Sequence, residues 1–256
     1  MRYHIDTIPI WDAMKTDSEC PLCALRRRTE RLLVDRSLGA SVMSPDTRIR
    51  VNERGFCSRH QAMMYDFPGG NRLGHGLMML SHLQSLRPRV EKAARNSAQG
   101  TSGAGALSRL FKAGKAEAAA ADSPLDALAA TCLLCEEMRQ QSDRQTASLL
   151  HLWKTEKAFR DAFLASKGLC VPDTAHALKM AEELLSGESL KDFKTAATRL
   201  LNENLKRLEE ELEWFTLKFD YRNADKPWGN SRDALERTVN KLRGWTLGPE
   251  PMQDDA

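Results

Sequence analysis

The cysteines of this chain fall into a pattern that suits metal coordination. The sequence contains six cysteines, and they occur in two sets of the same design. Each set is a Cys-x-x-Cys pair followed by a Gly-x-Cys element, and the intervening segments, residues 24–56 and 136–169, are nearly equal in length. This is an internal repeat, and it uses every cysteine in the chain.

The first set predicts a zinc site with three thiolates and one imidazole. Its donors are Cys20, Cys23, Cys57 and His60. A gap of two residues lets a tight turn or a first helical turn direct both side chains of a pair to one ion, and two separated pairs of this kind are typical of tetrahedral zinc. The alternative is that these cysteines are small buried apolar residues, as free cysteines often are.

The second set predicts a similar site with a less certain fourth donor. Cys132, Cys135 and Cys170 supply three thiolates, but the position that corresponds to His60 is Asp173, and the nearest histidine is His176. Both lie on one side of a helix that begins near Pro172. Imidazole is the commoner zinc partner of thiolates, so we favour His176 and keep Asp173 as the alternative.

Two structural zinc ions are therefore expected, because four protein ligands leave no open coordination position for hydrolytic catalysis. Iron–sulfur clusters are the alternative cofactor, since cysteine-rich sites bind either. The spacing of well-separated pairs favours zinc.

Helical periodicity dominates the elements that would position these donors. The clearest pattern repeats in steps of three and four residues, at Leu190, Phe193, Ala197, Leu200, Asn204, Leu208, Leu212, Phe215 and Phe219, and all of these except Asn204 are apolar. Similar patterns run over residues 132–165 and 73–94. The best strand candidate, Thr47 to Val51, is too short to found a sheet. The sequence predicts an all-α protein.

The repeat further predicts two related helical halves, each with its own metal site, packed into one bundle-like unit with pseudo-twofold symmetry. The halves would span residues 1–95 and 124–250. A Gly/Ala/Ser-rich segment over 96–123 is typical of a flexible linker, and residues 251–256 are expected to form a disordered tail.

The net charge and the hydropathy of the chain limit the classes of partner that it is expected to bind. The formal net charge is +3, which gives no global reason to expect a nucleic acid. Arg26, Arg27, Arg28 and Arg31 could contact phosphate, although a solvated helix face is the more usual reading. A membrane span needs roughly 20 apolar residues and no run approaches this, so no membrane insertion is expected. The first thirty residues lack a signal-peptide pattern, so we expect a cytoplasmic protein.

Other candidate residues carry weaker signals. His75 and His82 lie seven residues apart on one predicted helix face and could add ligands or proton-transfer groups, although packing or surface histidines are commoner. The sequence has no phosphate-binding loop, nucleophile elbow or paired catalytic carboxylates, so an enzyme is not indicated.

Several further motifs resemble an uncharacterised bacterial family of cysteine-paired helical proteins, over most of the chain. The matching elements are Tyr3-His4-Ile5, Ile8-Pro9-Ile10, Glu19-Cys20-Pro21-Leu22-Cys23, Met43-x-Pro45-Asp46-x-Arg48, Gly55-Phe56-Cys57-x-x-His60 and Phe219-Asp220-Tyr221-Arg222. Members are sometimes labelled ABC transporter substrate-binding proteins, a role that requires an export signal. The resemblance implies paired Cys-x-x-Cys and Gly-x-Cys-x-x-His elements, and Asp173 departs from that pattern.

These features favour a zinc-stabilised helical adaptor or binding protein that holds a protein or small ligand between its halves. The alternative is an iron–sulfur or thiol-redox protein, or a cofactor-handling enzyme, that uses the same cysteines.

Overall fold

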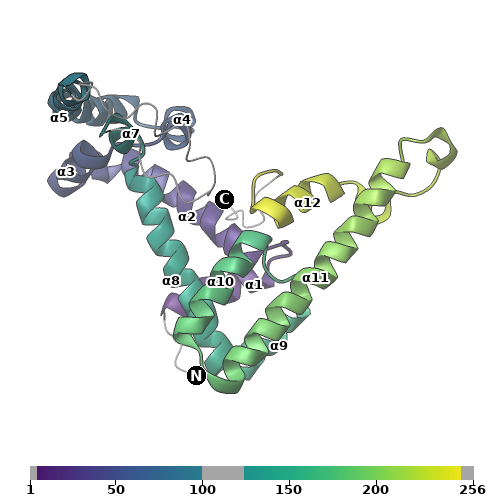
Figure 1. Cartoon of the computed structure of the whole chain (residues 1–256). Helices are drawn as coiled ribbons and strands as arrows, with labels where there is room; N and C mark the ends of the chain where they lie inside the picture. The colour runs from purple at the N-terminus through teal and green to yellow at the C-terminus, as the bar shows by residue number, and fades with distance from the viewer. Residues whose placement is uncertain (1–4, 100–123, 249–256) are drawn as a thin grey trace. The chain divides into compact units, whose positions relative to one another are not determined.

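The described part of the protein is built from α-helices. A computed structural model describes residues 5–99 and 124–248, and across these ranges it contains α-helices and 3-10 turns but no strand. The all-α prediction is confirmed. The helices, labelled in Figure 1, are α1 (Ile8–Lys15), α2 (Pro21–Leu38), α3 (Pro45–Arg54), α4 (Ser58–Asp66), α5 (Arg72–Gln99), α7 (Pro124–Ala129), α8 (Leu133–Thr155), α9 (Lys157–Ala165), α10 (Val171–Leu184), α11 (Gly187–Leu217) and α12 (Ala234–Arg243).

The chain divides into two compact units whose limits differ from the expected halves. The first unit combines residues 1–30 with 138–256, and the second unit consists of residues 31–137. Both boundaries fall inside helices, so α2 begins in the first unit and ends in the second, whereas α8 does the reverse. Each unit therefore contains sequence from both copies of the repeat.

The expected linker is only partly described. Residues 96–99 form the last turn of α5, whereas residues 100–123 and the expected tail at 251–256 lie outside the described ranges.

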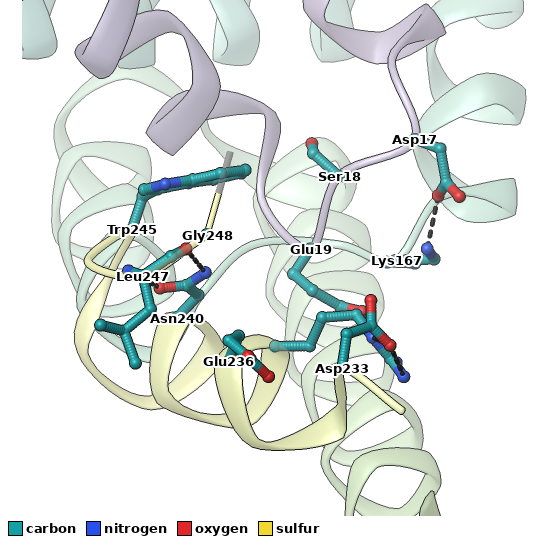
Figure 2. Close-up of a pocket in the computed structure, with 11 residues that line it drawn as sticks. Asp17, Ser18, Glu19, Lys167, Asp233, Glu236, Asn240, Trp245, Leu247 and Gly248 are labelled. Atoms are coloured by element: carbon teal, nitrogen blue, oxygen red, sulfur yellow. Dashed lines mark hydrogen bonds and ion pairs between the residues drawn. The ribbon is translucent and has the colours of Figure 1, made fainter. Parts of the chain in front are cut away.

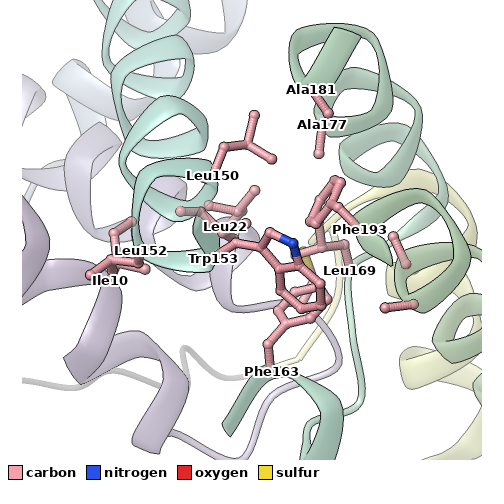
Figure 3. Packing of buried hydrophobic residues seen from close by; sticks show 14 of the residues in the cluster. Ile10, Leu22, Leu150, Leu152, Trp153, Phe163, Leu169, Ala177, Ala181 and Phe193 are labelled. Atoms are coloured by element: carbon pink, nitrogen blue, oxygen red, sulfur yellow. The ribbon is translucent and has the colours of Figure 1, made fainter. Parts of the chain in front are cut away.

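An aromatic group anchors the core of the first unit. The rings of Trp153 and Phe163 meet edge to face with centroids 5.7 Å apart, and Phe193 of α11 approaches Trp153 at 5.4 Å. Edge-to-face aromatic pairs add roughly 0.5–1.5 kcal/mol beyond the burial of their surface. Figure 3 shows these rings among aliphatic side chains from α1, α2, α8 and α10, namely Ile10, Leu22, Leu150, Leu152, Ala177 and Ala181.

The second unit has its own, smaller core. Val34, Val51, Met64 and Met78 are almost fully buried there, and they bring α2, α3, α4 and α5 together. Leu133 and Leu134 belong to the same cluster. The start of α8 is thereby fixed beside α4, where both helices carry candidate metal donors.

Two helix predictions had different outcomes. The long amphipathic pattern over residues 190–219 forms α11, which continues to Leu217. The pattern over 132–165 was expected to form one helix, but it is broken at Glu156, whose backbone is extended (φ −122°, ψ 113°) and caps α9. Apolar periodicity persists across the break, because α8 and α9 both face the same core.

Candidate metal centres

Four helices begin directly after a donor residue: α2, α4, α8 and α10. The carbonyl of that residue accepts the first helical hydrogen bond in every case, with N···O distances of 3.2 Å for Cys20, 2.9 Å for Cys57, 3.2 Å for Cys132 and 2.8 Å for Cys170. A second donor follows three residues later on the first turn, and these are Cys23, His60, Cys135 and Asp173. The partial positive charge of a helix N-terminus favours thiolate and carboxylate there.

The structure joins these pairs in a different combination from the one expected. One group contains Cys20, Cys23, Cys170 and Asp173, the first centre, and the other contains Cys57, His60, Cys132 and Cys135, the second centre. Within each group the ligand atoms lie within 4.8 Å of one another. Each Cys-x-x-Cys pair therefore meets the closing pair of the other repeat copy, and the expectation that each copy completes its own site was wrong.

Helix length explains the exchange. The 18 residues of α2 carry the chain roughly 27 Å away from Cys20 at 1.5 Å per residue, and the 10 residues of α3 span only about 15 Å. In the second copy α8 has 23 residues, about 35 Å, whereas α9 has only 9. In each copy the returning helix is therefore shorter than the outgoing one, and the closing cysteine lies beside the Cys-x-x-Cys pair of the other copy.

The fourth donor of the first centre is Asp173 and not His176, the residue that sequence reasoning favoured. His176 lies one turn further along α10, where its Nε2 is 3.0 Å from Asp143 Oδ1. Asp173 lies on the first turn of α10, and the first-turn residue is also the one that reaches the thiols in the other three helices. Position on the first turn therefore outweighs the chemical preference for imidazole.

Distances in the first centre fit a single four-coordinate ion. Asp173 Oδ2 lies 3.2 Å from Cys20 Sγ, 3.3 Å from Cys23 Sγ and 3.1 Å from Cys170 Sγ, and the last two sulfurs are 3.5 Å apart. Ligands at the usual zinc–sulfur distance occupy tetrahedron corners roughly 3.8 Å apart. All four side chains are buried.

Two neighbours orient the first centre. Arg26, three residues after Cys23, binds Asp173 Oδ1 and so leaves Oδ2 facing the sulfurs, and its other terminal nitrogen is 3.8 Å from Cys23 Sγ. The backbone N–H of Trp245 donates to the same sulfur at 3.3 Å. Second-layer contacts of this kind fix ligand geometry and offset negative charge. The predicted alternative role of Arg26 in phosphate binding has no support from this placement.

The three thiols and the carboxyl group of the first centre lie too close together for all four to be deprotonated in the absence of a cation. Burial raises the pKa of Cys20 to about 11, hydrogen bonds to Cys20 and Cys23 raise that of Cys170, and burial raises that of Asp173. Hydrogen bonds from Cys170 and Cys20 lower the pKa of Cys23 to about 5. One thiolate is stabilised at the expense of its neighbours, and a divalent cation would let all four donors deprotonate.

The second centre has similar spacing but greater exposure. His60 Nδ1 lies 3.3 Å from Cys57 Sγ, 3.3 Å from Cys132 Sγ and 3.5 Å from Cys135 Sγ, and Cys57 and Cys135 are 3.7 Å apart at sulfur. The backbone N–H of Cys135 donates to Cys132 Sγ at 3.4 Å. His60 and Cys132 are buried, Cys57 is partly exposed and Cys135 is exposed.

Charge distributes unevenly among the second-centre thiols as well. Burial acts to raise the pKa of Cys132, but hydrogen bonds, first among them that of His60, outweigh it and lower this pKa to about 6. Burial and the hydrogen bonds to Cys132 and Cys57 raise the pKa of Cys135 to about 12. A cation at this position would again stabilise the deprotonated set.

Both Gly-x-Cys elements depend on a glycine in the left-handed region. Gly55 has φ +61° and Gly168 has φ +69°, values that other residues adopt only with strain. Gly55 ends α3, and its carbonyl accepts a hydrogen bond from the N–H of Leu133 at 3.0 Å. This glycine thus links the approach to Cys57 with the start of α8.

Replacing Gly55 with alanine is expected to destabilise the second unit by about 1–3 kcal/mol, because of backbone strain. The added Cβ would also lie 2.5 Å from His82 Nε2, whose ring contacts the carbonyl of Asn52. Urea unfolding measures the loss. The matched control is Gly76→Ala in α5, where no atom lies within 4 Å of the new Cβ and a gain of roughly 0.5–1 kcal/mol is expected. Equal stability of the two variants would contradict the prediction.

A cavity of about 330 Å³ adjoins the first centre. Figure 2 shows Trp245, Leu247 and Asn240 on one side of it, with Glu19 and Lys167 opposite. The side-chain atoms Ser18 Oγ and Trp245 Nε1 belong to its lining residues, and both are buried without a hydrogen-bond partner among the residues that the structure describes. Pockets that hold small ligands usually measure roughly 300–1,000 Å³.

Sequence reasoning did not identify Lys241, which ties the approaches to the first centre together. Its fully buried ammonium group donates to the carbonyls of Glu19, at 2.9 Å, and Lys167, at 2.5 Å. The sequence gives no sign of this role, because a lysine on an amphipathic helix is normally solvated. The packing of α12 is what buries it. Arg26 was identifiable in part, because a spacing of three from Cys23 places both on one helix face.

The remaining histidine candidates belong to neither centre. His75 Nε2 lies 2.7 Å from Gln61 Oε1, and His82 Nδ1 lies 3.2 Å from the carbonyl oxygen of Asn52. Both therefore form local contacts within the second unit.

Fold and donor geometry together define an all-helical protein with two cysteine-rich centres suited to metal ions. The chain belongs to a family of unknown function, DUF6062, whose family model matches residues 1–248. No curated protein and no solved structure matches it significantly. Among the described helices, none combines the length and apolar character needed to cross a membrane.

Proposed function

We propose that this protein is a zinc-stabilised helical binding protein with two structural zinc ions. The observation that carries the proposal is the pair of four-donor groups, each with its ligand atoms within 4.8 Å of one another. Three thiolates with one imidazole or carboxylate form a complete tetrahedral ligand set, which leaves no position for a catalytic water. Zinc would join helix starts that are distant in sequence, so its binding free energy becomes folding free energy.

Compactness of the donor groups supports a single ion over an iron–sulfur cluster. A cluster places several irons and bridging sulfides between its cysteines, so its ligands lie farther apart than those of one ion. The carboxylate of Asp173 and the imidazole of His60 are also less usual cluster ligands than a fourth cysteine. Six free thiols further agree with a reducing compartment, and we extend the proposal to a cytoplasmic location.

The cavity beside the first centre supports binding as the role of this scaffold. Three of its lining residues are linked directly to the donor cysteines. Glu19 precedes Cys20, Lys167 lies three residues before Cys170, and the backbone N–H of Trp245 donates to Cys23 Sγ. The lining also includes the charged side chains Asp17, Glu236 and Arg237, which offer hydrogen bonds to a polar ligand. We infer that a small polar molecule binds here and that zinc orders the site; a protein partner is the alternative.

Elemental analysis of the protein, purified without added metal or chelator, tests the metal assignment. We expect two zinc ions per chain and no visible charge-transfer absorption, because the filled d shell of zinc has no such transitions. Cobalt substitution should give tetrahedral spectra with thiolate charge-transfer bands. Stoichiometric iron and inorganic sulfide would instead support the iron–sulfur alternative, and a metal-free chain that is fully folded would refute a structural role.

A further inference from the structure

The two centres differ sharply in the accessibility of their sulfur atoms. In the first centre Cys20, Cys23 and Cys170 are 2%, 2% and 0% exposed. In the second centre Cys135 is exposed and Cys57 is partly exposed. The rate at which a thiolate is oxidised follows its ionisation and its contact with solvent, so these sulfurs should not react alike.

Hydrogen bonds protect the first centre further. Cys23 Sγ accepts from the backbone N–H of Trp245 at 3.3 Å, and Arg26 contributes a positive charge at 3.8 Å. Donors of this kind withdraw electron density from a thiolate and lower its nucleophilicity. In the second centre the backbone N–H of Cys135 donates to Cys132 Sγ, which is the buried sulfur of that centre.

The two accessible sulfurs of the second centre are also close neighbours. Cys57 Sγ and Cys135 Sγ lie 3.7 Å apart, at the starts of α4 and α8. A disulfide requires about 2.05 Å between sulfurs, so these two must approach by roughly 1.7 Å for the bond to form. The other two donors, His60 and Cys132, are buried behind them.

We propose that the second centre is an oxidation site for hydroperoxides, at which formation of a Cys57–Cys135 disulfide expels the metal ion. The inference rests on the proposed zinc binding. It adds hydroperoxides as a reactant of the second centre, and an oxidised, metal-free form of that centre. The first centre stays reduced and metal-bound under the same conditions, because its sulfurs are buried.

The reaction balances in two steps. The Cys135 thiolate attacks the peroxide, the O–O bond breaks, and a sulfenic acid and a hydroxide ion form. The Cys57 thiolate then attacks the sulfenic sulfur, the S–O bond breaks, and a second hydroxide leaves as the disulfide forms. Two electrons pass from sulfur to the peroxide, and two protons from solvent convert the hydroxides to water. Only His60 and Cys132 then remain as donors, too few to retain zinc.

Zinc release from the full-length, zinc-loaded protein tests this proposal. Hydrogen peroxide is added in small excess, free zinc is followed with a chromogenic chelator, and the cysteines are mapped by mass spectrometry. We expect one of the two ions to leave at least tenfold faster than the other, with a disulfide between Cys57 and Cys135. A thiol reductant and added zinc should restore two ions per chain.

A variant without the first centre supplies the control. In Cys20→Ala/Cys23→Ala, the remaining ion should leave at the fast rate of the wild-type protein. Equal rates for both ions, faster loss from the first centre, or a disulfide between Cys132 and Cys135 would overturn the proposal. These results remain distinct from failure of the proposed function, in which the untreated protein would hold no thiolate-bound zinc.

Discussion

Replacing both Cys20 and Cys23 with alanine is expected to remove one zinc ion and to leave the other fully bound. The structure places these thiols with Cys170 and Asp173, whereas Cys57, His60, Cys132 and Cys135 form the second centre without them. Since a structural zinc site contributes on the order of 10 kcal/mol to folding, the first unit should lose its cooperative unfolding transition. The second unit, which contains all four donors of the other centre, should keep its own.

Alkylation of the zinc-loaded double variant distinguishes this grouping from the one that the repeat suggests. We expect Cys170 to become reactive, while Cys57, Cys132 and Cys135 stay protected relative to a chelator-treated sample. If each repeat copy completed its own site, Cys57 would become reactive and Cys170 would stay protected. His176→Ala is the matched control, because His176 contacts Asp143 outside both centres, and this variant should retain two ions.

Lys241→Met is expected to destabilise the first unit by about 3 kcal/mol, because two buried carbonyls lose a charged donor. Methionine keeps most of the side-chain volume, so the change isolates the hydrogen bonds to Glu19 and Lys167. Burial lowers the pKa of Lys241, while the negative charges of Glu19, Cys20 and Cys170 act in the opposite direction. The ammonium is thus held among the groups that lead into the first centre.

Urea unfolding at a fixed free zinc concentration measures the effect of Lys241→Met. Weaker zinc retention at the first centre should accompany the loss, since both carbonyls belong to segments that lead to its ligands. Lys206→Met is the surface control: this side chain is 78% exposed, and its loss should change stability by less than about 0.5 kcal/mol. Indistinguishable unfolding of the two variants would show that Lys241 has no structural role.

Much of the local structure was predictable. The apolar periodicity of residues 190–219 identifies α11, and the spacing of three residues identifies the donor pairs Cys20/Cys23, Cys57/His60 and Cys132/Cys135. The glycines of the two Gly-x-Cys elements also mark the turns that precede α4 and α10. Each of these features depends on residues a few positions apart, so the sequence pattern reports it directly.

The choice between donors at one position was harder. His176 was favoured over Asp173 on chemical preference, but the side chain on the first turn of α10 reaches the sulfurs and the one on the next turn contacts α8. Arg26 stabilises the Asp173 carboxylate among the thiols, because it binds Oδ1 and offsets the negative charge of the carboxylate. Arg26 lies on α2 and Asp173 on α10, so the spacing of residues along the chain does not reveal this ion pair.

The sequence by itself determined the helical class, three of the four donor pairs and the helix starts that carry them, because these follow from propensity and from spacing within one turn. Tertiary structure alone decided which pairs meet, which sulfurs are buried, and that Arg26, Lys241 and Trp245 support the first centre. These outcomes depend on helix lengths and on how helices pack over long separations in sequence. Two similar repeat copies are compatible with either pairing, and only the geometry of α2 and α8 distinguishes them.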